Sequence, residues 1–430
     1  MFASFFPRPQ LFFISAVALT AVCMAVWYLF LRDYGEALSL GWLIGYAYPA
    51  PLPDGADDAA KAAFTVTRDR AIDVWLYQFM IVVGAIFAVV WARIAPHKWF
   101  WWSVVVSSII LFVVWFQVQL DVMINVWFGS FYDLIQKALA TPNSVTLDEY
   151  YSQLTTFLII ATVSITVAVL NAFLVSHYVF RWRWAMNDYY VANWDRLRKI
   201  EGASQRIQED TMRFASVVEG LGVSLVDSVM TLIAFLPILW GLSSFVKVLP
   251  FFGEVPQALV IIAITWSAFG TGLLALSGIR LPGLAFRNQR VEAAYRKELV
   301  LGEEYASRAE PPTLNMLFAN VRTNYFRIYL NYLYFNIARY GYLQAGVLLP
   351  YVALAPTIVV AGFTLGVMQQ ILRAFGRVES SFQYLVASWT TIIELISIYK
   401  RLKAFEATLV DRPLDRIERE GPDQPVPESA

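Results

Sequence analysis

The stretch RIQEDTMRFASVVEGLGVSLVDSVMTLIAFL, residues 206–236, starts as a charged helix and ends as an apolar one that belongs in lipid. Glu219 and Asp227 lie where its polarity is already falling. A carboxylate in hydrocarbon costs several kcal/mol unless it faces water or a partner. We therefore expect this helix to cross a membrane with its acidic positions turned toward water or toward another polar group.

The rest of the chain has the composition of a polytopic membrane protein. Of its 430 residues, 58% are hydrophobic and 15% are charged, and the mean hydropathy is +0.54, well away from a soluble average. The formal net charge is zero, which gives no sign of nucleic-acid binding. Cys23 is the single cysteine, and His97 and His177 are the two histidines, so neither an internal disulfide nor a metal site is expected.

Apolar runs long enough to span a bilayer predict eight helices. They lie near residues 11–31, 74–95, 101–127, 155–180, 217–245, 256–280, 327–355 and 366–399. The first follows MFASFFPRPQ without a small-residue cleavage site, which indicates an uncleaved helix and not a signal peptide.

The distribution of Lys and Arg predicts one orientation. These cations gather in residues 181–215 and 281–326, which the positive-inside rule places in the cytoplasm, and good helix formers there predict helical extensions of the spans or separate surface helices. Residues 122–153, 246–255 and 350–365 carry few cations or none, so they are expected outside. Both termini are then cytoplasmic. Residues 33–73, with YPAPLPDGADDAAKAA, are expected to form an insertion outside the membrane.

Five stretches carry a resemblance to a known family: HYVFRWRWAMNDYYVANWDRLRKIEGASQRIQEDTMRFA (177–215), FYDLIQKAL (131–139), SGIRLPGLAFRNQRVEAAYRKELVLGEE (277–304), NYFRIYLNYLYFNIARY (324–340) and SWTTIIELISIYKRLKAFE (388–406). In these the chain resembles the SbmA/BacA peptide-uptake transporters of bacterial inner membranes. The likeness runs from MFASFFPRP to about Glu406 and omits chiefly the insertion 33–73, expected in the periplasm, and the Pro-rich tail.

The resemblance implies an all-α membrane protein with residues 1–406 as one transporter domain. Two copies would form a homodimer arranged like the transmembrane half of an ABC exporter, around a large cavity. Such proteins lack an ATPase domain and use protons to import peptides, including antimicrobial peptides and peptide-like antibiotics, from periplasm to cytoplasm. The expected partners are a second copy, membrane lipid and cationic peptides, with no cofactor. Residues 407–430 are expected to be a disordered cytoplasmic tail, too short for a nucleotide-binding domain.

Two alternatives remain open. The segment TLGVMQQILRAFGRV (364–378) is similar to the start of the last helix of ABC-type membrane domains that resemble peroxisomal fatty-acyl transporters. A lipid or very-long-chain fatty-acyl permease would borrow an ATPase in trans, since the chain has no Gly-Lys pair for a phosphate-binding loop. A membrane-embedded enzyme is the second alternative, although no paired histidines, His-Glu metal motif or activated nucleophile can be identified.

Proton coupling needs groups whose charge changes as access alternates. Glu219 is the first candidate. The family resemblance implies a ladder of glutamates in the cavity, which we assign to Glu219, Glu292 and Glu303, with Glu201 and Glu209 as further candidates. Glu292 and Glu303 are eleven residues apart and share a helix face. The alternative for Glu292 is a solvated face, where it pairs with Arg296 one turn later.

Residues 366–399 carry a polar stripe at three- and four-residue steps: Arg373, Arg377, Ser381, Tyr384, Ser388, Thr391 and Glu394. The stripe predicts a cavity face, or alternatively a buried contact in which Arg377 pairs with an acid. Arg339 is a possible partner for Glu394. Tyr332 belongs to a tyrosine-rich segment suited to peptide contact or to ordinary packing. Asp227 would line the cavity or bond to a neighbouring Ser or Thr.

Overall fold

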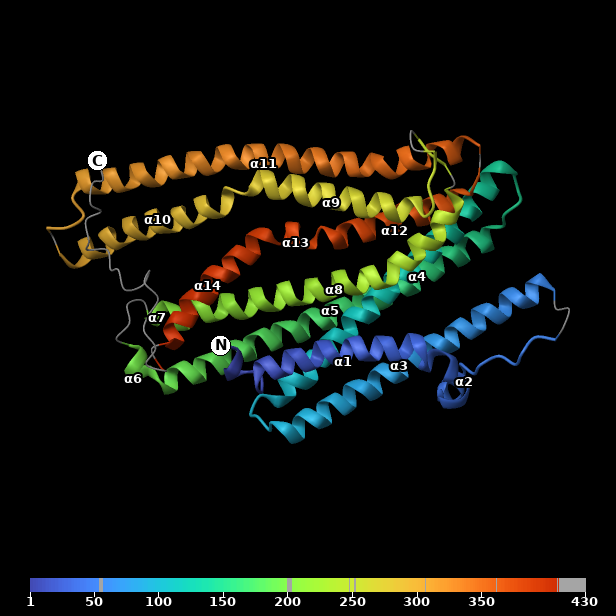
Figure 1. Ribbon diagram of the computed structural model, residues 1–430, viewed down its shortest axis with the longest axis horizontal. Helices are drawn as coiled ribbons and strands as arrows, with labels where there is room; N and C mark the ends of the chain where they lie inside the picture. The colour runs from blue at the N-terminus through green and yellow to red at the C-terminus, as the bar shows by residue number, and fades with distance from the viewer. Residues whose placement is uncertain are drawn as a thin grey trace. The chain divides into compact units, whose positions relative to one another are not determined.

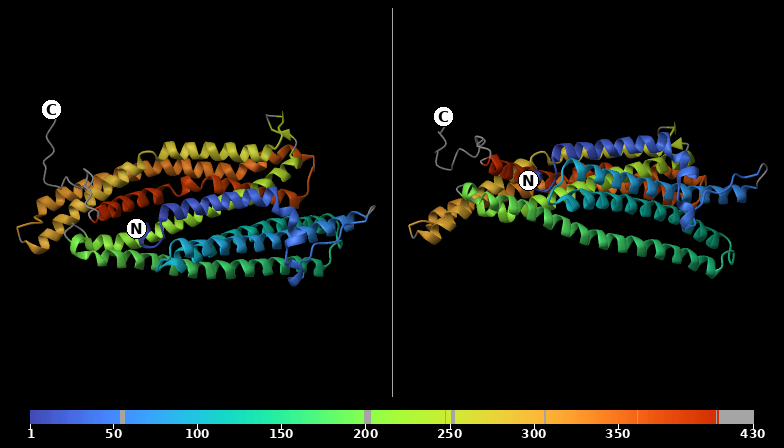
Figure 2. Two further views of the ribbon diagram at one scale, coloured as in Figure 1. Left: turned by 60° about the horizontal axis from the view of Figure 1, so that its bottom comes forward. Right: turned by 90° about the horizontal axis from the view of Figure 1, so that it is seen from below.

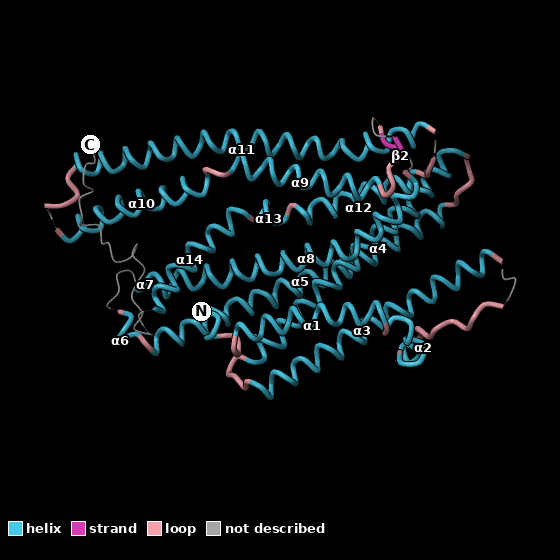
Figure 3. The backbone as a smooth tube through the Cα atoms, in the orientation of Figure 1, coloured by secondary structure: helices cyan, strands magenta, loops and turns pink. Residues whose placement is uncertain are grey.

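The described part of the chain is helical, as Figure 3 shows in cyan, with one pair of two-residue strands. The computed structural model describes residues 1–53, 57–198, 203–246, 248–250, 253–305, 307–360, 362–407 and 409. Glu201 and residues 410–430 therefore lie outside the described chain, and so does the expectation of a disordered tail. Seven helices of the described residues are long and apolar enough to cross a membrane: 9–29, 63–94, 101–140, 147–192, 203–245, 258–285 and 311–359.

The chain divides into two units, and the first consists of Met1–Val113, Asn171–Ser216 and the segment that starts at Lys400. Its helices, in chain order, are η1 (Phe2–Ser4), α1 (Pro9–Leu29), η2 (Leu31–Tyr34), α2 (Gly35–Leu38), η3 (Gly41–Ile44), α3 (Asp58–Ile94), the π-helix η4 (Trp101–Val106), α6 (Trp194–Leu197), α7 (Ala203–Gln205) and the π-helix η5 (Arg206–Asp210). Four longer helices belong partly to this unit and partly to the second one.

The second unit consists of Val114–Leu170 and Val217–Tyr399. The helices that it shares with the first are α4 (Ser107–Ala140), α5 (Leu147–Ala192), α8 (Thr211–Leu242) and α14 (Trp389–Ala407). Its own elements are η6 (Ser243–Phe245), β1 (Val248–Leu249), β2 (Gly253–Glu254), α9 (Ala258–Gly278), α10 (Leu281–Glu304), α11 (Pro311–Val359), α12 (Leu365–Phe382) and α13 (Tyr384–Ala387). Strands β1 and β2 pair antiparallel.

The core of the first unit is aromatic. Phe5 is fully buried and stacks on Trp182, with ring centroids 5.6 Å apart, and Phe214 packs edge-on against Trp182 at 5.8 Å. The N-terminal ammonium pairs with Glu406, whose carboxylate also accepts a hydrogen bond of 2.9 Å from Tyr190. These contacts hold the first residues of the chain against the end of α14.

The core of the second unit is aliphatic and joins four helices. Leu239 of α8, Leu259 of α9, Leu354 of α11 and Phe375 of α12 are all almost completely buried in one cluster. Such side chains are close-packed in protein interiors, so the cluster fixes α12 against the apolar spans around it.

Several helices are much longer than a bilayer requires. The 46 residues of α5 and the 49 residues of α11 extend about 70 Å each at 1.5 Å per residue, against about 30 Å of hydrocarbon. Helix α10 lies beside α11 as a hairpin, which Figures 1 and 2 show in yellow and orange. The segment expected to extend the fourth and fifth spans, 181–215, is not a single helix, because α5 ends at Ala192 and three short elements, α6, α7 and η5, precede α8.

Two helix boundaries differ from the sequence prediction. Helix α3 begins at Asp58, sixteen residues before the predicted span at 74, because Asp57 caps it by accepting a hydrogen bond of 2.8 Å from the amide of Ala60. Residues 366–399, expected as an eighth span, form α12, α13 and the start of α14, and none of these is among the apolar candidates.

Candidate functional site

The candidate site lies along α12. The first backbone amides of this helix donate hydrogen bonds to side chains of α4. The first amides of a helix lack internal partners. Here Gln136 accepts from the amide of Leu365 at 2.6 Å, and Asp133 accepts from the amide of Gly366 at 2.9 Å. A side chain at position 366 would collide with the carbonyl oxygen of Gly129 and with Asp133, so only glycine permits this approach.

The same two helices meet again two to three turns along α12, in a cluster of opposite charges. Arg377 contacts one carboxylate oxygen of Asp121 at 2.6 Å, and Arg373 contacts the other at 3.4 Å. The guanidinium of Arg373 also lies 5.0 Å from the ring centre of Phe128. The order of the pairs shows that α4 and α12 run antiparallel, because the pairing residue on α4 falls from 133 to 121 as that on α12 rises from 366 to 377.

A third helix completes this cluster. Asp227 on α8 lies within electrostatic range of both Arg377 and Asp121. Two arginines and two carboxylates on three helices therefore interact electrostatically, with a formal charge of zero. We call Asp121, Asp227, Arg373 and Arg377 the charge cluster. Ionised groups among apolar helices are costly and typically pair with one another, as Asp121 does with both arginines.

Arg377 forms an ion pair with an acid, which was one of the two hypotheses for this residue, and its place in a substrate cavity stays a prediction. The acid itself, Asp121, was not among the predicted site residues. Its signal in the sequence was weak but present, since it is a single carboxylate in the apolar run FQVQLDVMINVWF, 116–128. Ser381, another member of the predicted stripe, is buried and donates to the carbonyl oxygen of Arg377 at 2.9 Å.

Glu219 lies on α8 eight residues before Asp227, about 12 Å along the helix. Its side chain is half-buried, and no described residue donates a hydrogen bond to it or forms an ion pair with it. Nearby, the hydroxyl of Tyr384 donates to the carbonyl oxygen of Leu221, which brings α13 onto this part of α8. Among the described residues, Glu219 is thus an acid without an ion-pair partner, near a predicted member of the polar stripe.

The remaining predicted residues are dispersed. Glu292 is partly buried and Glu303 exposed, both on α10, while Tyr332 and Arg339 are exposed on α11. Ser388 and Glu394 are partly buried at the end of the second unit. No hydrogen bond or ion pair of the described residues joins Glu219 to either acid of α10, so their membership of one ladder stays a prediction.

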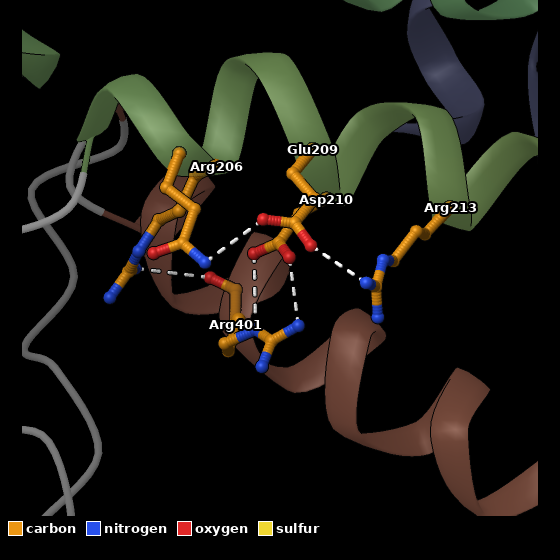
Figure 4. A network of polar contacts seen from close by, with 6 residues as sticks. Arg206, Glu209, Asp210, Arg213 and Arg401 are labelled. Carbon is orange, nitrogen blue, oxygen red and sulfur yellow. Dashed lines mark hydrogen bonds and ion pairs between the residues drawn. The ribbon is translucent and has the colours of Figure 1, made fainter. Parts of the chain in front are cut away.

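Glu209 belongs to a separate polar network in the first unit, shown in Figure 4. It forms an ion pair of 2.8 Å with Arg213 and accepts from Gln205 at 3.1 Å. Beside it, the buried Asp210 receives two hydrogen bonds from Arg401 of α14, of 3.0 Å and 2.8 Å. Bidentate pairs of this kind fix geometry, so this network anchors the π-helix η5 to α14.

Comparison with known proteins gives a family and several relatives. The family model described as "SbmA/BacA-like family" matches residues 96–410. The inner membrane ABC transporter ATP-binding protein YddA of Escherichia coli is 24% identical over 340 residues, which cover 73% of this chain and 59% of the relative. An uncharacterized ABC transporter ATP-binding protein of Haemophilus influenzae is 25% identical over 200 residues, 44% of this chain and 32% of its own.

A third relative, the uncharacterized ABC transporter ATP-binding protein sll0182 of Synechocystis, is 25% identical over 255 residues, 57% of this chain and 36% of the relative. The chain thus spans about a third to three fifths of the length of these relatives. The matched family range includes all four residues of the charge cluster, as well as Glu219.

Proposed function

The chain belongs to the SbmA/BacA-like family, and from this premise we propose that it is a secondary transporter that imports peptides across the bacterial inner membrane, driven by protons. Seven apolar helices and the family match make it a multi-pass membrane protein. The cargo includes cationic peptides, antimicrobial peptides and peptide-like antibiotics. Two copies form the working unit, with both termini in the cytoplasm.

The observation that carries the proposal is the pair of carboxylates, Asp121 and Asp227, inside the apolar helices α4 and α8. Such residues are rare in spans and mark pathways for ions, protons or substrates. Asp121 neutralises one arginine at 2.6 Å and reaches a second at 3.4 Å, and Asp227 of α8 lies within electrostatic range of Arg377 and Asp121. Protonation of Asp227 would leave the cluster with a net positive charge, so occupancy by a proton changes the attraction between α8 and α12.

Glu219 is our candidate for the coupling acid. A carboxylate that has no cationic partner can exchange a proton without first breaking an ion pair. The ionised form favours an arrangement in which Glu219 faces water, and the neutral form tolerates an apolar surrounding. Alternation between these two arrangements would tie proton transfer to the side on which the cargo site is open. One elementary charge that crosses 100 mV supplies about 2.3 kcal/mol, so one or two protons suffice for accumulation.

The test is uptake of a fluorescent cationic peptide by the purified full chain in proteoliposomes, with an imposed pH gradient and no nucleotide. We expect uptake by the unaltered chain. Glu219→Gln should reduce the rate at least tenfold and flatten its dependence on external pH. Glu254→Gln is the matched control, because Glu254 is an exposed acid of β2 outside the apolar helices. A Glu219→Gln profile that matches that of the unaltered chain would remove Glu219 from the coupling role.

A second candidate is supported by the names of the relatives, which are ABC transporter ATP-binding proteins. In this alternative the chain is a lipid or fatty-acyl permease that works with an ATPase in trans. The same proteoliposomes distinguish the two. Transport that proceeds only with ATP and an added ATPase, and not with a pH gradient, would support the permease and contradict proton-driven import.

A further inference from the structure

A groove between α11 and α12 contains a carboxylate that the charge cluster does not include. The groove has a volume of about 400 Å³, and its walls carry Leu343, Val347 and Tyr351 from α11 with Phe375, Glu379 and Gln383 from α12 and its end. Most of these side chains are apolar, and Glu379 is the acid among them. The volume suits one or two amino-acid side chains rather than a whole peptide.

One oxygen of Glu379 is held by donors from α9, from α11 and from the residue that follows α12. Its Oε1 accepts from the indole of Trp266 on α9 at 3.0 Å, from the hydroxyl of Tyr342 on α11 at 3.2 Å, and from the amide of Gln383 at 2.9 Å. The ring of Tyr342 also stacks on Trp266, with centroids 4.9 Å apart and planes within 17°. Hydrogen bonds to a charged acceptor are shorter and stronger than neutral ones, so this set fixes the carboxylate in place and stabilises its negative charge.

The backbone leaves room for this arrangement at two glycines. A Cβ at Gly346 of α11 would lie 2.9 Å from Glu379 Oε1 and 3.2 Å from the indole nitrogen of Trp266. A Cβ at Gly270 of α9 would collide with the ring of Tyr342. Both positions allow close approach only without a side chain. The network is therefore built by α9, α11 and α12 together.

The second oxygen of Glu379, Oε2, receives no hydrogen bond from the described residues, and none of their ion pairs includes Glu379. The arginines of the same helix, Arg373 and Arg377, contact Asp121 on α4 instead. An ionised carboxylate at an apolar wall lowers its free energy most by pairing with a cation. The groove thus offers one fixed negative charge that forms no ion pair with the part of the chain that the structure describes.

We propose that this groove binds a primary ammonium or guanidinium group on an apolar stem, such as the end of a lysine or arginine side chain. Glu379 Oε2 would accept the hydrogen bonds of the cation, and the side chains of Val347, Tyr351 and Phe375 would enclose its methylene groups. Aromatic rings add attraction for a cation near their faces. The inference deepens the proposed function. It rests on that function in one respect, that the bound cation belongs to the transported cargo.

The test is equilibrium binding by fluorescence anisotropy, with the full chain in nanodiscs of uncharged lipid and without any pH gradient. The probe is a fluorescein-labelled peptide of four arginines, and its neutral counterpart has four citrullines, whose urea groups have the shape of guanidinium without the charge. We expect the arginine peptide to bind the unaltered chain at least tenfold more tightly. Glu379→Gln should bring the two affinities within about twofold of each other, while Glu254→Gln should keep the difference.

A Glu379→Gln chain that keeps the tenfold preference would overturn the inference, and so would an unaltered chain that shows none. Val347→Trp is a second variant that does not touch the network, since Val347 is exposed at the groove wall. It should weaken binding of both peptides at least fivefold by filling the groove. Unchanged binding in that variant would also contradict the site, even if Glu379→Gln failed to fold.

These outcomes are distinct from failure of the proposed function. Loss of the charge preference in Glu379→Gln, together with uptake that strictly requires ATP, would retain the site and reject proton-driven import. Uptake driven by a pH gradient, with the charge preference unchanged in Glu379→Gln, would retain the proposed function and reject the site.

Discussion

At the scale of single residues, Asp121 is the acid on which the charge cluster depends. Asp121→Asn would leave two arginines without their carboxylate among apolar helices. Breaking one partner of a buried pair costs about 3–5 kcal/mol, and partial exposure of these side chains reduces the expected loss to about 1–3 kcal/mol. Thermal unfolding of the purified protein in detergent measures this as a lower midpoint temperature.

The matched control is Asp148→Asn, which changes an exposed acid in the first turn of α5. The double variant Asp121→Asn with Arg377→Gln should be less destabilised than the sum of the two single variants, because neither charge is then left alone. Additive effects would show that the two side chains do not interact energetically.

His97 gives a pH-dependent prediction outside the spans. Burial lowers the pKa of its imidazole, and its Nδ1 accepts a hydrogen bond of 3.2 Å from the amide of Trp99. Below the ordinary histidine pKa, about 6.5, the unfolded chain binds the proton more readily than the folded chain does, so acidification lowers stability. His97→Asn keeps an acceptor for Trp99 and should reduce the fall in midpoint temperature between about pH 8 and pH 5. An identical slope in both proteins would assign the acid sensitivity elsewhere.

The sequence predicted Glu219, Asp227 and Arg377 as polar residues of apolar helices, and the structure places the last two in one cluster. It did not predict Asp121 or Glu379. Residue spacing shows which side chains share a face of one helix, and Asp121 meets Arg377 from another helix more than two hundred positions away. Glu379 lies on α12 between the predicted positions of the polar stripe, so only the positions of Trp266 and Tyr342 reveal its role.

At the scale of elements, the start of α12 depends on α4. Asp133→Ala would remove the acceptor for the amide of Gly366 and a negative charge near a helix N-terminus. We expect a loss of about 1–2 kcal/mol, as for other helix caps, and faster amide exchange at residues 365–368 in hydrogen–deuterium mass spectrometry.

Asp133→Asn is the informative companion, because it keeps the acceptor oxygen and removes only the charge. The amides of residues 365–368 in this variant should exchange at a rate between those of the Ala variant and the unaltered chain. Equal protection in all three proteins would mean that Thr364, whose hydroxyl accepts from the amide of Val367 at 3.3 Å, is a sufficient cap by itself.

Apolar periodicity predicted the long helices well and their ends less well. The span expected at 74–95 begins instead at Asp58, since the residues before 74 are good helix formers that hydropathy alone does not count. Residues 366–399 contain a helix as expected, but it stops at Phe382 and resumes as α13 and α14. Polar side chains at Arg373, Arg377 and Glu379 find partners on three other helices, which length and composition cannot anticipate.

At the scale of the whole molecule, the predicted orientation can be tested by cysteine labelling. In a Cys23→Ser background, Thr141→Cys introduces a thiol between α4 and α5, and Ser307→Cys introduces one between α10 and α11. Both positions are exposed. A reagent that does not cross membranes should label Cys at 141 from the periplasmic side of intact spheroplasts and should label Cys at 307 only after lysis.

Labelling of both positions in intact cells, or the reverse pattern, would contradict the orientation derived from the positions of Lys and Arg. The family assignment would stand in either case, because it depends on the match over residues 96–410 and not on topology.

Helix α11 runs without interruption from its hairpin with α10 to the groove at Glu379. From Leu314 near its start to Gly346 beside the carboxylate it runs 32 residues, or about 48 Å, and both of its internal prolines, Pro350 and Pro356, come later. A stiff rod of that length converts a tilt of about 5° at one end into a displacement of about 4 Å at the other. A partner or cargo that binds at the distant hairpin and tilts α11 would therefore displace Tyr342 relative to the Glu379 carboxylate.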